Sequence, residues 1–440
     1  MTRDRLARLA GALIARIDAL VSRQLDAVLH HPAFQKLEAA WRGLRHVVDH
    51  APDGGTVRVQ VLVFSLAEIK RDVRGASQFD QSELFRKFYS PLDTPGDVPL
   101  GLVVGDYEFT NHPDHLEILE HAAGCAAAAF APFVASAAPG LLDLKSFADL
   151  ERPLNLPRTF EQKDYIKWKA LRAMEDSRFV ALVLPRVLMR LPWADDSRRA
   201  DGFVYREDVS APDRSGWLWG SAAFAYAGML ARNFDEAGWL ADIRGVRRGE
   251  VGAGLVTGLP AADWRSDRPG AVPRPPTEVV VTDALDRALG DLGFLPICWC
   301  QDTREAAFHG AQSIQSPKAF DRPEATANAR LSAMMPYMLC AGRFAHYIKV
   351  MMREKVGSVK TAGELEDSLN TWLQQYCNAS EGAGAEMRAR HPLREGRVEV
   401  SEVRGMAGRY ACRVFLRPQF QLDHLVGTIE LQTRQDTRRE

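Results

Sequence analysis

Short apolar runs alternate with helix-periodic segments over most of the chain, and this alternation limits the possible folds more than any other feature. Residues 100–104 and 179–184 are continuous apolar runs, which is the pattern of a strand covered on both faces. Residues 115–130 lie between them, are rich in alanine and have the length of a helix. Strands that alternate with helices in this way predict a mixed α/β core.

The same two patterns predict most of the remaining elements. Apolar residues at steps of three and four predict an opening helix over 6–28, and Pro32 is placed to start a second helix. Further helices are expected at 84–88, at 165–171 after a capping box of Thr159 and Gln162, and at 217–234. Further strands are expected at 57–63, 132–137, 239–243, 278–282 and 294–300.

The last third of the chain changes from helices to strands. A long helical region over 325–356 is interrupted at Pro336, and Thr361 with Glu364 forms a capping box for the next helix. The first two strands of the tail are expected to pair as a hairpin, because glycines separate them. The three strands of this tail are expected at 397–403, 409–417 and 425–432.

We expect four parts along the chain, separated where these patterns change. They are a helical segment over 1–52, an α/β body over 53–260, a second α/β and helical part over 261–390, and C-terminal strands over 391–440 that pair with partner subunits. Residues 260–277 contain five prolines, so this junction is expected to be extended and stiff.

Composition and charge exclude several classes of protein. Lysine and arginine total 56 and aspartate and glutamate total 57, so the net charge is −1 and gives no general attraction to nucleic acid or to an anionic membrane. Apolar runs are too short for membrane insertion, and we expect no signal peptide at the N-terminus. The six cysteines lie in apolar surroundings, which favours reduced thiols in the cytoplasm over disulfides.

A search for catalytic or metal-binding residues finds no convincing set, so we predict no catalytic residue, cofactor or metal. The glycines at 252, 254 and 258 miss the dinucleotide-binding spacing, and the sequence has no phosphate loop, nucleophile elbow or zinc-protease helix. Cys298 and Cys300 could face one side of a strand and hold a soft metal. Because no second ligand pair accompanies them, two buried thiols are the favoured interpretation.

Histidines and methionines offer weaker alternatives. His112, His115 and His121 fall in one segment, where metal binding or acid–base work is conceivable, but capping and surface roles are favoured. His346 is interpreted as a packed helical histidine. A core role is favoured over a binding face for the methionines at helical spacing, which are Met334, Met335, Met338, Met351 and Met352.

The strongest positive signal in the sequence concerns association. Three strands beyond the last helix can form a small sheet with open edges, and open edges recruit strands from other chains. Arg404, Arg413 and Arg417 offer the alternative that charge protects these edges. The candidate residues for partner contact are Val398, Val400, Val403, Tyr410, Cys412, Val414, Leu416, Val426, Ile429 and Leu431.

Motif blocks along nearly the whole chain are familiar when they are taken in order. The longest is HPAFQKLEAAWRGL at 31–44, and GDYEF follows at 105–109. The further blocks lie at 121–133, 165–168, 175–178, 184–186, 191–192, 219–225, 276–279, 345–350 and 417–420. Together they resemble the large subunit of the contractile sheath of the type VI secretion system, a family related to the contractile tail sheaths of phages.

The resemblance implies a structural protein of the bacterial cytoplasm. In that family the large subunit pairs with a small sheath subunit, and the heterodimers stack helically around an inner tube of ring-shaped hexamers, on a baseplate. The C-terminal strands join strands of the small subunit and of neighbouring protomers, and residues 397–432 match that region. Contraction drives the inner tube outward, and a recycling ATPase then dismantles the sheath.

Two alternatives remain beside the sheath subunit. Family chains usually carry several dozen residues before the helix that opens here, and that extension supplies strand exchange and the contact with the ATPase. The ATPase is therefore the least expected partner, and the runner-up is a short sheath-like paralogue that caps or regulates assembly. The remote alternative is an α/β enzyme with an unrecognised site.

Overall fold

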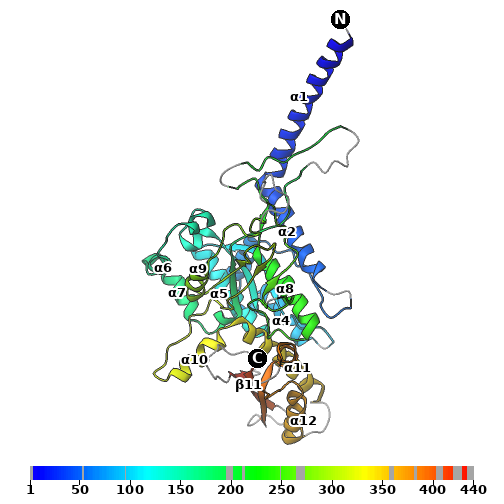
Figure 1. The fold of residues 1–440 in the computed structure, drawn as a ribbon. Coiled ribbons are helices and arrows are strands. Elements are labelled where there is room, and N and C mark those ends of the chain that lie inside the picture. The colour runs from blue at the N-terminus through cyan, green and yellow to red at the C-terminus, as the bar shows by residue number, and fades with distance from the viewer. Residues whose placement is uncertain are drawn as a thin grey trace.

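The computed structural model describes residues 3–51, 54–94, 96–194, 202–210, 214–247, 249–263, 273–355, 361–380, 384–402, 410–419 and 429–433. An α/β body lies at the centre, a long helix extends from one end of it, and the C-terminal elements pack at the other end (Figure 1). Helix α1 (Arg3–Leu29) is the extension, and α2 (Pro32–Asp49) continues from it onto the body. Both helices were predicted by the apolar periodicity and by the proline at the start of α2.

A parallel four-stranded sheet forms the centre of the body. Strands β2 and β3 are buried over their whole length, which explains why their sequences are continuous apolar runs. Helices separate successive strands along the chain, so the predicted mixed α/β fold class is confirmed. The sheet has the order β1 (Val103–Phe109), β2 (Phe133–Ala137), β3 (Val180–Leu184) and β7 (Phe294–Pro296).

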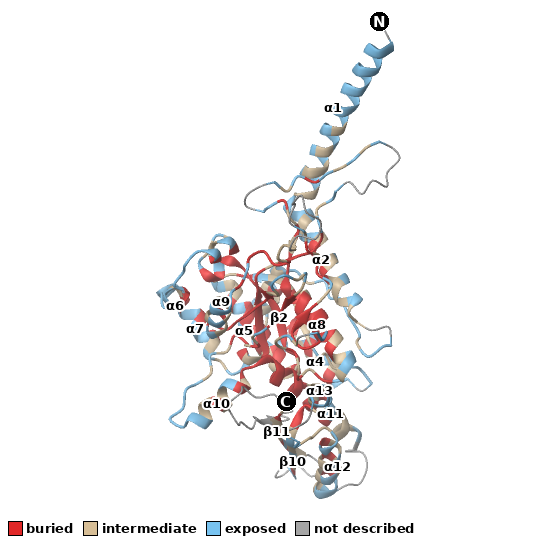
Figure 2. Ribbon diagram, in the orientation of Figure 1, coloured by how far each residue is buried: buried red, intermediate tan, exposed pale blue. Residues whose placement is uncertain are grey.

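Helices cover both faces of this sheet, and the buried core lies between them (Figure 2). Phe133 and Ala135 of β2 belong to the apolar cluster that contains α5 (Pro113–Ala129). Val134 belongs to the cluster that contains α8 (Ala222–Ala237). Because successive residues of a strand point to opposite faces of a sheet, α5 and α8 lie on opposite faces.

Shorter elements complete the body and connect it to the C-terminal part. None of the helices in the described ranges combines the length and the apolar character that crossing a bilayer requires. The remaining helices are α3 (Leu66–Gly75), α4 (Glu83–Asp93), α6 (Leu156–Phe160), α7 (Ile166–Ala173), α9 (Asp283–Asp291), α10 (Pro323–Ser332), α11 (Met335–Lys355), α12 (Ala362–Gln374) and α13 (Ala385–Arg390). Two small antiparallel sheets pair β4 (Val187–Leu188) with β5 (Trp219–Gly220), and β9 (Ala306–Ala307) with β6 (Leu255–Val256) and β8 (Cys298–Trp299).

Three predicted strands are wrong. Residues 57–63, 239–243 and 278–282 form no strand. An alternating or apolar sequence fits a strand, but a strand exists only where a neighbour supplies hydrogen bonds. Residues 239–243 serve another purpose, because Trp239 stacks on Phe344 of α11 with ring centroids 4.2 Å apart.

One predicted helix start is also wrong. Thr159 and Gln162 form no capping box, because Thr159 lies inside the short helix α6. The cap of that helix is Asn155, whose side-chain oxygen accepts a hydrogen bond of 3.3 Å from the backbone N of Arg158. The other predicted box is confirmed, since the side chains of Thr361 and Glu364 both cap the start of α12.

Candidate assembly interface

The C-terminal strands form a separate three-stranded antiparallel sheet. Its order is β10 (Leu393–Glu402), β11 (Tyr410–Pro418) and β12 (Ile429–Thr433). β10 and β11 pair as the predicted hairpin, with Val398 opposite Val414. Two of the candidate contact residues, Val403 and Val426, lie outside the described residues.

One face of this sheet packs on the helices of its own subunit. Val398 and Val414 belong to an apolar cluster with Phe344 of α11 and with Leu369 and Leu373 of α12. The candidate contact residues that are buried in this way are Val398, Val400, Cys412, Val414 and Leu416. These side chains therefore hold the sheet to its own subunit, and their role in partner contact stays a prediction.

The other candidates lie at the margins of the sheet. Tyr410 begins β11 and packs, partly buried, against the same apolar cluster. Ile429 and Leu431 lie on β12, where the register places them opposite Leu416 and Val414. β12 is an outer strand of the sheet, so these two residues occupy the edge position that the sequence predicts for strand addition.

The opposite face of the sheet carries charged side chains. Nη2 of Arg397 lies 2.5 Å from Oε1 of Glu399 on the same strand. Nη1 of Arg417 lies 3.3 Å from Oε2 of Glu395 on the neighbouring strand, and Arg413 is exposed opposite Glu399. Since one face is covered and the other is charged, the edges are the parts of this sheet that suit the addition of a further strand.

Helix α12 covers the outer edge of β10. The side-chain amide of Asn370 donates a hydrogen bond of 2.9 Å to the carbonyl of Val398 and accepts one of 2.8 Å from the backbone N of the same residue. Oε2 of Glu366 accepts a hydrogen bond of 2.9 Å from the backbone N of Val400. Nε2 of Gln374 donates one of 2.9 Å to the carbonyl of Gly396.

Sequence reasoning missed this contact. Its only signal is the spacing of Glu366, Asn370 and Gln374, three polar residues four apart that follow the apolar positions 365, 369 and 373. Such spacing predicts one polar stripe on a helix, but it does not indicate what the stripe contacts.

The cysteine pair considered as a soft-metal site lies on and just after strand β8. Burial raises the pKa of both the Cys298 and the Cys300 thiol. Within the ranges that the structure describes, no three histidine, cysteine or acidic side chains are grouped as metal ligands. The interpretation of Cys298 as a buried thiol is confirmed, and Cys300 is half-buried.

The three histidines of the 112–121 segment act separately. Nδ1 of His112 accepts a hydrogen bond of 3.2 Å from the backbone N of residue 114 and caps α5. Nδ1 of His115 accepts one of 3.0 Å from the backbone N of residue 110. Nε2 of His121 lies 2.7 Å from the hydroxyl of Ser82. Each ring bonds to a different part of the local structure. The predicted surface role is confirmed for His112, which is exposed, and is wrong for His121, which is buried.

His346 and the first three methionines are part of the core. Nε2 of His346 lies 2.8 Å from the carbonyl of Ala129 at the end of α5. Met334, Met335 and Met338 are buried, which confirms the core interpretation for them. Met351 and Met352 are partly buried against the apolar cluster under the C-terminal sheet.

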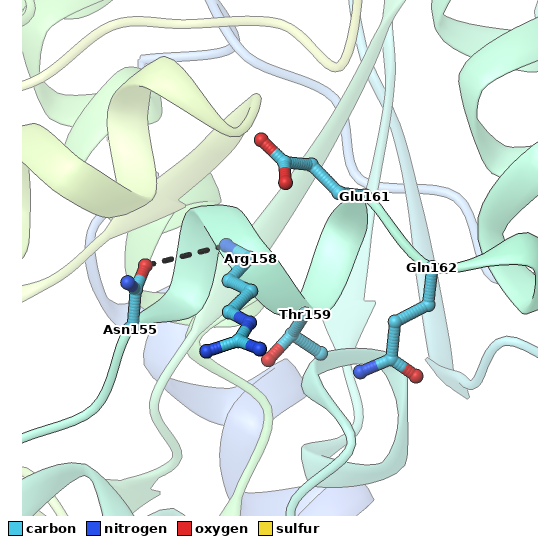
Figure 3. Close-up of a pocket in the computed structure, with 5 residues that line it drawn as sticks. All are labelled: Asn155, Arg158, Thr159, Glu161 and Gln162. Carbon is cyan, nitrogen blue, oxygen red and sulfur yellow. Dashed lines mark hydrogen bonds between the residues drawn. The ribbon is translucent and has the colours of Figure 1, made fainter.

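A surface depression beside α6 does not have the character of an enzyme site. It has a volume of about 450 Å³ and is lined by Asn155, Arg158, Thr159, Glu161 and Gln162 (Figure 3). All five residues belong to one short segment, and four of them are exposed. An active site usually brings polar groups together from several elements, and this depression does not.

Comparisons with known proteins agree with a structural role. Residues 11–315 match the family model of the EvpB/VC_A0108 tail sheath N-terminal domain, and residues 324–435 match that of the tail sheath gpW/gp25-like domain. The type VI secretion system sheath protein TssC1 of Pseudomonas aeruginosa is 36% identical over 433 residues, which cover 98% of this chain and 86% of that protein.

A solved structure is similar at a much lower level. A chain of the baseplate of the anti-feeding prophage aligns with 87% of this chain and 84% of its own length, at 12% identity and a TM-score of 0.39. The assignment rests on the two family models and the sheath relative, which span nearly all of the sequence. The chain belongs to the large-subunit tail sheath family of the type VI secretion system.

Proposed function

We propose that this chain is the large subunit of a contractile sheath. It would assemble with a small sheath subunit into a helical tube around an inner tube and contract to propel that tube. Its partners would be the small sheath subunit, neighbouring sheath protomers, the hexamers of the inner tube and the baseplate, in the bacterial cytoplasm. The role is structural, and we assign the chain no catalytic step.

The apolar surface of α1 is the observation that carries this proposal. No residue of this 27-residue helix is buried, and Figure 2 shows it extending from the body with most of its surface exposed. The exposed fractions of its apolar side chains are 56% for Leu6, 54% for Leu9, 54% for Leu13, 58% for Ile14, 57% for Ile17, 52% for Leu20, 40% for Val21 and 47% for Val28.

These side chains form one stripe, because residues three and four apart share a face of a helix. Burying the exposed halves of all eight is worth on the order of 8 kcal/mol. Most of the stability of a helix in a protein comes from packing its apolar face. The free energy available from covering the stripe therefore favours a partner that packs along α1, as in a permanently assembled subunit.

The mechanism follows from repetition. A head-to-tail contact that is repeated along a screw axis gives an open tube rather than a closed ring. If each unit has an extended and a contracted packing, a difference of a few kcal/mol per unit adds up along the tube and supplies mechanical work. The rigid α/β bodies rotate, and the C-terminal sheets keep neighbouring protomers linked.

Co-expression with the small sheath subunit tests this proposal. Electron microscopy of the purified complex should reveal hollow tubes of uniform width. A complex that never forms tubes would instead support a capping or regulatory paralogue. Failure of the two subunits to bind each other would overturn the proposal.

Variants on α1 test the observation itself. Leu13→Asp with Ile17→Asp places two charges in the apolar stripe and should abolish co-purification of the small subunit. The matched control is Ala15→Asp with Ala19→Asp, two exposed positions on the opposite face of the helix. Tubes formed equally well by both double variants would eliminate α1 as the contact.

A further inference from the structure

The outer edge of β10 is the edge at which a strand of another chain could also be added. In an antiparallel strand, the backbone groups of alternate residues point to alternate sides. Gly396, Val398 and Val400 point away from β11, since their carbonyl or N–H groups bond to α12 instead. These are the groups with which an added strand would pair, and side chains of α12 occupy four of them.

The fit between helix and strand has a simple geometric basis. Residues four apart in a helix are separated by about 6 Å along its axis, and residues two apart in a strand are separated by about 6.8 Å. Polar residues at 366, 370 and 374 can therefore follow alternate residues of β10, and they do so in antiparallel order. The side-chain amide of Asn370 acts like a peptide group of a neighbouring strand, because it both donates to and accepts from Val398.

A glycine allows this helix to lie close to the strand. A Cβ atom at Gly396 would lie 2.7 Å from Cδ2 of Leu373, which is too close for real contacts. Leu373 is itself fully buried, as are Leu365 and Leu369 on the same helix. A strand could reach this edge of β10 only when α12 moves away from it, and the hydrogen bonds from Glu366, Asn370 and Gln374 to β10 oppose that movement.

We propose that Glu366, Asn370 and Gln374 are edge-protecting residues that close the β10 side of the C-terminal sheet and restrict strand addition to the β12 side. The proposal deepens the proposed sheath function and rests on it for its role in assembly. A sheet with two open edges can join other sheets on both sides and associate without control. A helical tube needs one defined contact in each direction, and a sheet with one closed edge provides it.

The test compares self-association of full-length variants. Glu366→Ala with Asn370→Leu removes the partners of Val398 and Val400 and keeps the apolar face of α12. The matched control is Asp367→Ala with Thr371→Leu, at exposed positions on the same helix, where the Thr371 hydroxyl donates to the backbone carbonyl of Asp367. Sedimentation velocity of the subunit without its small partner, across a range of concentrations, should shift to larger species for the edge variant and not for the control.

A proline substitution in β10 shows whether the association takes place at the edge of this strand. Val400→Pro removes an N–H that points away from β11, so the ladder with β11 is retained and the β10 edge is blocked. Added to the edge variant, it should return the sedimentation profile to that of the wild type. An edge variant that associates no more than the control, or whose association survives the proline, overturns the proposal.

A second pair of variants and the absence of the small subunit allow the sedimentation experiment to test the proposal in every case. If the edge variant fails to fold by circular dichroism, Asn370→Leu alone is compared with Thr371→Leu in the same way. The sedimentation measurement does not use the small subunit, so its result does not depend on whether tubes form in the co-expression experiment. The reverse also holds, because tubes can form even if β10 proves to have no protecting residues.

Discussion

The hydroxyl group of Tyr205 donates a hydrogen bond of 2.6 Å to Oδ1 of Asp26. Asp26 lies near the end of α1, and the same oxygen accepts a hydrogen bond of 3.3 Å from the backbone N of Asp208. Nε2 of His30, just beyond the helix, lies 3.2 Å from Oε1 of Glu207. Polar contacts with residues 202–210 thus hold the C-terminal end of α1 in place, although no residue of the helix is buried.

Removal of the Tyr205 hydroxyl should make the C-terminal end of α1 open more often. Tyr205→Phe deletes a hydrogen bond to a carboxylate, which costs about 1–2 kcal/mol. Amide hydrogen exchange over residues 20–29 should become roughly 5–30 times faster. Tyr347→Phe is the control, because its hydroxyl accepts a hydrogen bond from Arg343 on the same helix. Exchange over residues 20–29 that is equal in both variants would contradict the prediction.

Arg190 should matter far more to stability than its neighbour Arg42. Its Nε lies 2.8 Å from Oε1 of Glu38 and its Nη2 lies 2.9 Å from Oε1 of Glu207, and all three side chains are largely buried. Arg190→Met removes the buried guanidinium group that two buried carboxylates share and should lower the free energy of unfolding by about 3–5 kcal/mol.

The control for Arg190 is a second arginine on the same carboxylate. Nε of Arg42 also lies 2.8 Å from Oε1 of Glu38, but its side chain is 37% exposed. Arg42→Met should therefore cost about 1 kcal/mol or less. Urea unfolding of the two variants measures the difference, and similar losses would mean that Arg190 is no more important than a surface residue.

The sequence predicts elements whose signals are local and misses those that depend on a neighbour. The capping box at Thr361 and Glu364 is contained within four residues, and it forms. Residues 57–63 alternate as a strand should, but no strand of the described chain pairs with them, because pairing depends on what lies alongside. The tail strands were predicted correctly because each had a suitable sequence and a neighbouring strand with which to pair.

The candidate interface was predictable to the same extent. Apolar residues of the tail were expected to contact partners, and several of them face the helices of their own subunit, so their contact with partners stays a prediction. The bond between Asn370 and Val398 joins residues 28 positions apart. Such a contact is decided by how a helix docks on a strand, and neither local sequence contains that information.

Protonation linked to His346 should lower the free energy of unfolding at acidic pH. Burial lowers the pKa of His346 to about 4, even though the carbonyl of Ala129 favours the protonated ring. The unfolded chain takes up this proton near pH 6.5, and the folded chain does not until the pH approaches 4. The contribution of this group is therefore present above pH 6.5 and is lost as the pH falls, by about 2 kcal/mol between pH 7 and pH 5.

A variant isolates this contribution from that of other groups. His346→Gln cannot titrate, so its free energy of unfolding should lose about 2 kcal/mol less than that of the wild type between pH 7 and pH 5. Denaturant unfolding of both proteins at the two pH values gives the difference, and parallel losses in the two proteins would refute the assignment.

Gly43 should be essential for the contact between α2 and α8. A Cβ atom at this position would lie 2.2 Å from Cδ2 of Phe224, so Gly43→Ala forces the ring or the helix to move and should cost about 1–3 kcal/mol. Alanine also favours a helix over glycine by about 1 kcal/mol, and the clash must exceed that gain. Gly11→Ala is the control, because nothing lies within 4 Å of its Cβ position on α1, and it should stabilise the helix.

Phe224→Leu replaces the ring with a smaller side chain and should relieve the clash. The double variant Gly43→Ala with Phe224→Leu should therefore recover part of the stability that Gly43→Ala loses. Thermal unfolding of the single and double variants measures this coupling. If Gly43→Ala is as stable as Gly11→Ala, then α2 is free to move away from α8. The link between the projecting helix and the sheet-bearing body would then have to depend more on other contacts, such as the polar ones around Arg190 and Asp26.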